Sequence, residues 1–63
     1  MTQQEAVSLV EHWIQEYSLL AAQVVHVAPA AGGAWIVQAE CSEAIWRQKV
    51  SPEGEVGAPE LMD

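Results

Sequence analysis

A single segment near the start of this chain has the spacing of an amphipathic helix, and it limits what the rest can be. From residue 6 to residue 21, apolar side chains recur at intervals of three and four, which places them in one stripe of a helix. Thr2 precedes the stripe and Glu5 follows three residues later, the spacing of a capping box. We therefore predict a helix over residues 2–20. Its core residues are expected to be Val10, Trp13, Ile14 and Tyr17.

The remaining residues must cover that stripe, because a lone helix cannot bury its own apolar side. Residues 23–28, 34–41 and 44–50 have the composition or alternation of short strands. Pro and Gly mark turns at 29–33 and 51–54, and such short links make neighbouring strands antiparallel. The predicted fold class is α+β, with one N-terminal amphipathic helix packed on a three- to four-stranded antiparallel β-meander. Residues 55–56 are the candidate fourth strand.

Chain length and cysteine content limit how this fold is stabilised. With 63 residues the chain makes one domain, and Cys41 is its single cysteine, so no disulfide can form within it. His12 and His26 add too few ligands for a structural zinc site, so we expect no metal. We predict one domain over residues 1–56, followed by a flexible acidic C-terminal tail over residues 57–63.

The charge balance excludes several classes of partner. Nine acidic residues face two basic ones, Arg47 and Lys49, which gives a formal net charge of −7. Such a charge repels phosphate backbones and anionic lipid, so we expect no nucleic-acid and no membrane partner. The first residues lack the basic stretch of a signal peptide, and one free thiol suits a reducing compartment. We therefore expect a cytoplasmic protein; a fragment of a secreted precursor is the alternative.

The candidate chemical groups favour structural roles. His12 and Glu16 lie one helical turn apart, but two ligands are too few for zinc, so we expect a solvated polar face. Cys41 ends an apolar alternation and is predicted to be a small core residue; a small cysteine-dependent enzyme is the remote alternative. His26 is expected to share a strand face with Val24, half-exposed. We predict no enzyme activity and no cofactor.

The sheet face away from the helix is the predicted interface. Strand alternation puts Ile36 opposite Trp35 and Ile45 opposite Trp46. If both Trp residues face the helix, the two Ile residues and the stems of the two basic residues form the outer patch. If the third strand is shifted in register, Trp46 joins that patch. The candidate interface residues are Ile36, Ile45, Trp46, Arg47 and Lys49.

These features predict a small non-catalytic protein-interaction module, either an accessory subunit, a regulator or an inhibitor. Excess apolar content and an uncovered sheet face support this hypothesis. The alternative from another class is a self-assembling homodimeric structural protein, paired through the same face.

One family resemblance covers most of the chain. The residues are Gly33-Ala34-Trp35-Ile36-Val37, and then Val50-Ser51-Pro52-Glu53-Gly54-Glu55-Val56. With a helix before them, a hairpin, and a final strand–turn that ends in Gly-acid-Val, they resemble a PepSY-type domain. The resemblance implies a binding or inhibitory module without catalysis, and it assigns no site residues. The chain departs from the family in lacking an export signal within these residues.

Overall fold

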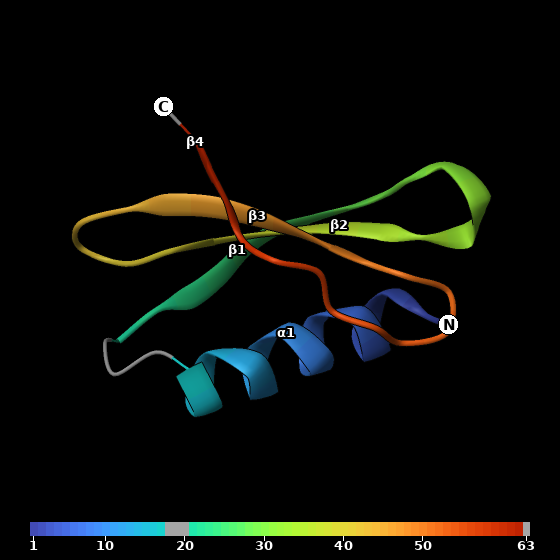
Figure 1. The fold of residues 1–63 in the computed structure, drawn as a ribbon, viewed down its shortest axis with the longest axis horizontal. Helices are drawn as coiled ribbons and strands as arrows, with labels where there is room; N and C mark the ends of the chain where they lie inside the picture. Colours follow the sequence, from blue (N-terminus) through green and yellow to red (C-terminus); the bar gives the residue numbers. More distant parts are fainter. Residues whose placement is uncertain (18–20, 63) are drawn as a thin grey trace.

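The computed structural model describes residues 1–17 and 21–62, and it confirms the α+β fold class (Figure 1). Helix α1 spans Gln3–Tyr17 and lies on one face of a four-stranded antiparallel sheet. The strands are β1 (Gln23–Pro29), β2 (Trp35–Glu40), β3 (Ile45–Val50) and β4 (Glu60–Met62), adjacent in chain order. Residues 18–20, predicted to be the last of the helix, lie outside the described part.

The start of α1 has the predicted capping box. The Thr2 backbone N–H donates to Glu5 Oε1 at 2.8 Å, and the Glu5 backbone N–H donates to Thr2 Oγ1 at 3.1 Å. Two N–H groups that the first helical turn leaves unpaired are thereby satisfied. The bond from the Thr2 backbone, followed by the bond with its side chain, lowers the pKa of Glu5 below its ordinary value. The ionised carboxylate is therefore the form that caps the helix.

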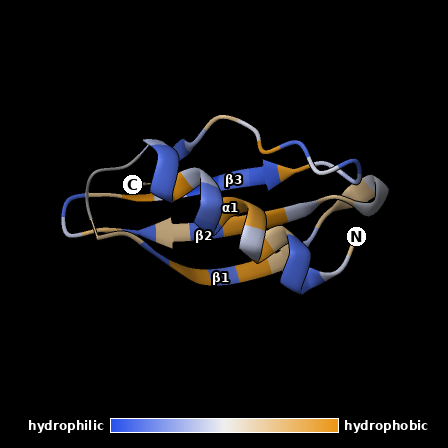
Figure 2. Ribbon diagram, turned by 90° about the horizontal axis from the view of Figure 1, so that it is seen from below, coloured by the Kyte–Doolittle hydropathy of each residue, from blue (hydrophilic) through white to orange (hydrophobic). Residues whose placement is uncertain are grey.

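The core lies between α1 and the middle of the sheet. Figure 2 shows the helix lying diagonally across the sheet, and it contacts β1, β2 and β3. The core cluster comprises Ala6, Val10, Ile14, Val37, Ala39, Trp46 and Val50. Of the predicted core residues, Trp13 is half-buried and packs against this cluster, whereas Tyr17 is 69% exposed, with its ring 5.2 Å from that of Trp13. The helix contacts the sheet along the line of residues 6, 10 and 14, whereas 13 and 17 lie on the neighbouring line.

A β-bulge in β1 changes which side chains face the helix. The pairing of β1 with β2 shifts between Val24 and His26, so Val25 is the extra residue. Val24 consequently packs against the core, while Val25 and His26 are both exposed. The prediction that His26 shares a face with Val24 is wrong for this reason, because the bulge inverts the alternation between them.

The chain after β3 continues within the fold, whereas the sequence predicted a tail from residue 57. After the turn at 51–54, Val56 forms an isolated bridge with Val50, and the Gly57 N–H donates to the Lys49 carbonyl at 2.8 Å. β4 then pairs with β3, so the fourth strand lies at 60–62 and not at 55–56. Gly57 suits this close approach: a Cβ there would lie 3.2 Å from the Lys49 carbonyl oxygen, so the neighbouring backbone would have to shift by a few tenths of an ångström.

Candidate functional surface

The sheet face opposite α1, called here the outer face, is defined by the strand register. Residues that pair across strands point to the same side, and Ile36 pairs with both Ala28 and Lys49. The next row joins Gln38 to His26 and Arg47, and Arg47 pairs in turn with Glu60. The outer face comprises Gln23, His26, Ala28, Ile36, Gln38, Glu40, Ile45, Arg47, Lys49, Glu60 and Met62. No helix or strand in the described part of the chain covers it (Figure 1).

Both basic residues of the protein lie on the outer face. Arg47 donates from Nη2 and Nε to Glu60 Oε1, at 2.7 and 3.1 Å, across the β3–β4 ladder. Both side chains are more than half exposed, so this ion pair contributes at most about 1 kcal/mol. Lys49 is exposed two residues further along β3, and its side chain makes no ion pair within the described residues.

Exposed apolar groups accompany these charges. Ile45 is 40% exposed and pairs directly with Met62, which is 36% exposed. Ile36 is half-buried and lies toward the other end of β2, beside Lys49. Apolar groups therefore lie at both ends of the outer face, with a charged and amide-bearing row between them.

The fifth predicted interface residue, Trp46, is on the opposite face. It is 7% exposed and belongs to the core cluster, where its Nε1–H donates to Gln48 Oε1 at 2.9 Å. Of the two registers considered from the sequence, the structure has the one in which Trp35 and Trp46 both face the helix side. Trp46 is therefore excluded from the outer face, and the other four predicted residues are brought together on it.

Sequence reasoning missed the part of this surface that β4 contributes, Glu60 and Met62. The sequence pattern that could have predicted them is short. In the run Glu60-Leu61-Met62 alternate residues share a face of the strand, and Glu60 lies opposite Arg47. Gly57 and Pro59 precede this run and are typical of a loop. A three-residue strand has too little alternation to outweigh them.

The other candidate groups are dispersed. Cys41 is half-buried and packs against the core, whereas His26 is on the outer face. His12 Nε2 lies 3.0 Å from Glu16 Oε1 on the exposed side of α1, as the spacing predicted. Among the described residues, no three His, Cys, Asp or Glu side chains are grouped closely enough to hold a metal ion. The Cys41 thiol and the His26 imidazole are therefore on opposite faces of the sheet.

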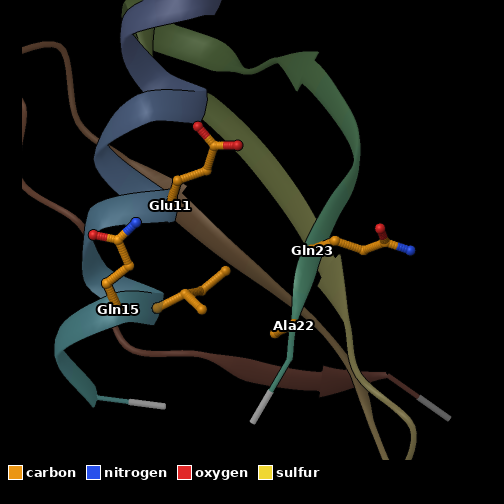
Figure 3. A pocket seen from close by; sticks show the side chains of 5 residues that line it. Glu11, Gln15, Ala22 and Gln23 are labelled. Atoms are coloured by element: carbon orange, nitrogen blue, oxygen red, sulfur yellow. The ribbon is translucent and has the colours of Figure 1, made fainter. Parts of the chain in front are cut away.

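An open depression of about 300 Å³ lies between the C-terminal half of α1 and the start of β1 (Figure 3). It is lined by Glu11, Ile14, Gln15, Ala22 and Gln23. Glu11, Gln15 and Gln23 are exposed, so their polar atoms are solvated. None of the predicted interface residues contributes to this depression.

Comparison of the chain with protein-family models, with curated proteins and with solved structures returned no match. The resemblance to PepSY-type domains therefore stays a prediction. Within residues 1–17 and 21–62, no helix combines the length and the apolar character needed to cross a membrane.

Proposed function

We propose that this protein is a non-catalytic interaction module whose binding surface is the outer face. The observation that carries the proposal is the neighbouring pair Ile45 and Met62, both exposed on a sheet face that no other layer covers in the described chain. Apolar side chains grouped at such a surface are typical of protein-binding sites. Arg47, beside them, belongs to the residue types enriched at binding hot spots.

The same proposal covers activity and location. Binding would be the whole of the activity, as in an accessory subunit, a regulator or an inhibitor, and the chain would need no cofactor. Cys41 would act as a packing residue, consistent with its position against the core. We place the protein in the cytoplasm, where a single thiol stays reduced.

Ile45→Glu tests the proposal, because a charge at this exposed site is tolerated by the monomer but is costly when a partner desolvates it. Leu61→Glu is the matched control: Leu61 is 74% exposed and pairs with Trp46, on the other face of the sheet. Tagged protein, recovered gently from the cells that produce it, is analysed by native mass spectrometry. Complexes seen with the wild type and Leu61→Glu, and lost with Ile45→Glu, support the proposal. Wild type recovered alone, or complexes that survive Ile45→Glu, contradict it.

A further inference from the structure

We infer that the partner of the outer face is a second copy of this chain, and that the two outer faces pack together in a symmetric dimer. This inference rests on the proposed function, because it names the occupant of the same surface. It is carried by the distribution of charge over the described residues.

The outer face is electrically neutral on a strongly acidic protein. Its two cations, Arg47 and Lys49, are balanced by the carboxylates of Glu40 and Glu60. The other described residues carry six carboxylates and no Lys or Arg, so a formal charge of −6 lies away from the outer face. Two copies that approach by any other surface bring like charges together, whereas contact through the outer faces keeps those charges far apart.

The arrangement of these charges favours self-pairing over an acidic foreign partner. An acidic partner needs an excess of positive charge, but Arg47 already binds Glu60 and the face as a whole has none. Lys49 and Glu40 lie at opposite ends of the β2–β3 ladder, Lys49 paired with Ile36 and Glu40 with Ile45. A two-fold axis running across the strands brings the Lys49 end of one copy over the Glu40 end of the other, twice per dimer.

Both members of that pair are available. Neither Lys49 nor Glu40 forms an ion pair within the described part of the chain, where the salt bridges join other residues. Ile36 and Ile45 accompany them, one at each end, so the same axis would also bring apolar groups of the two copies together. A chain of this length buries only about 60% of its unfolded surface alone, and dimerisation would remove further apolar area from water.

The test reverses the charge of Lys49 in one variant and the charge of Glu40 in another. The mass of the purified protein is followed by light scattering from micromolar to millimolar concentration in low salt, for the wild type, Lys49→Glu and Glu40→Lys. Each single change converts two attractions of the symmetric dimer into two repulsions. We expect the wild type to dimerise and each variant to dimerise at least about tenfold more weakly. Glu53→Lys, an exposed change in the turn after β3, is the control and keeps the dimer.

Mixing the two variants gives the decisive result. A copy with Lys49→Glu and a copy with Glu40→Lys complement one another at both contacts, so the mixture should form a heterodimer that neither variant alone can match. Circular dichroism verifies that each variant is folded. A wild type that stays monomeric, or a mixture that associates no better than the single variants, overturns the inference. If the wild type is monomeric while Ile45→Glu still abolishes a complex with another protein, the inference fails and the proposed function stands.

Discussion

Gln48 offers the sharpest test of how this small core is held together. It is 1% exposed on the helix side of β3, where its Oε1 accepts the Trp46 indole N–H. Its Nε2 donates to the Gly57 carbonyl at 3.0 Å, so one amide joins the core to the segment that leads to β4. The perturbation is Gln48→Leu, which nearly conserves volume but removes both hydrogen bonds.

The cost follows from the two groups left behind. A buried indole N–H without a partner costs about 1–3 kcal/mol, and the half-buried Gly57 carbonyl, which water can reach, costs about 1 kcal/mol. Burial of the apolar leucine offsets about 1 kcal/mol. We expect a net loss of about 2 kcal/mol in the free energy of unfolding, from a total of roughly 3–9 kcal/mol for a chain of this length. The melting temperature should fall by about 10 °C.

Urea denaturation followed by circular dichroism measures the loss, and amide hydrogen exchange shows where it acts. The Gly57 N–H, bonded to the Lys49 carbonyl, should exchange faster in Gln48→Leu because its segment has lost its side-chain anchor. Gln38→Leu on the outer face of β2 is the matched control, measured at a concentration where the protein is monomeric. Among the described residues its side chain makes no hydrogen bond, so stability should change by less than about 0.5 kcal/mol. A Gln48→Leu protein as stable as the wild type, with unchanged exchange at Gly57, would refute the reasoning.

Three further predictions follow from the helix and the chain end. Val10→Ala should lower the free energy of unfolding by about 2 kcal/mol, while Tyr17→Ala, at an exposed ring, should change it by less than about 1 kcal/mol; thermal melts compare the two. Because the folded-state pKa of Glu5 is lowered, its contribution is complete above the ordinary value of 4.5 and is lost as pH falls through the lower folded pKa. The difference in melting temperature between wild type and Glu5→Gln should shrink across that range; a constant difference contradicts the capping role. A chain ending at Val56 should melt lower than one ending at Ala58, which keeps the Gly57 carbonyl for Gln48; equal melting temperatures would show that this contact is dispensable.

The main outline of the fold could be predicted because it depends on local sequence. Thr2 and Glu5 are three residues apart, and that spacing alone fixes the start of the helix. The alternation through β2 and β3 predicted that Trp35 and Ile36 lie on opposite faces of the sheet, as do Trp46 and Ile45, with the helix covering one of these faces. The inward placement of Trp35 followed from that choice, whereas Trp46 was left between the two faces because the register of the third strand depends on contacts between strands.

What escaped prediction depends on contacts between strands. The bulge at Val25 is set by how β1 meets β2, and nothing in the run Val24-Val25-His26 marks it. Gly57 was interpreted as the start of a tail, because its close approach to the Lys49 carbonyl is a tertiary contact. The burial of Gln48 was likewise hidden, since a polar residue is stable in the core only when partners distant in sequence satisfy it.

The bulge and the end of β1 also bear on how this protein resists aggregation. β1 is a seven-residue edge strand and carries no Asp, Glu, Lys or Arg. An edge strand of this kind can pair with a strand of another molecule. The Ala30 N–H donates to the Ala34 carbonyl, so alternation turns the backbone of Pro29 outward, where proline has no N–H to offer. Val25 interrupts the ladder further along the strand. A strand from another molecule therefore meets only a short stretch of regular backbone donors and acceptors. This arrangement hinders amyloid-like extension of the sheet, although β1 carries no Asp, Glu, Lys or Arg.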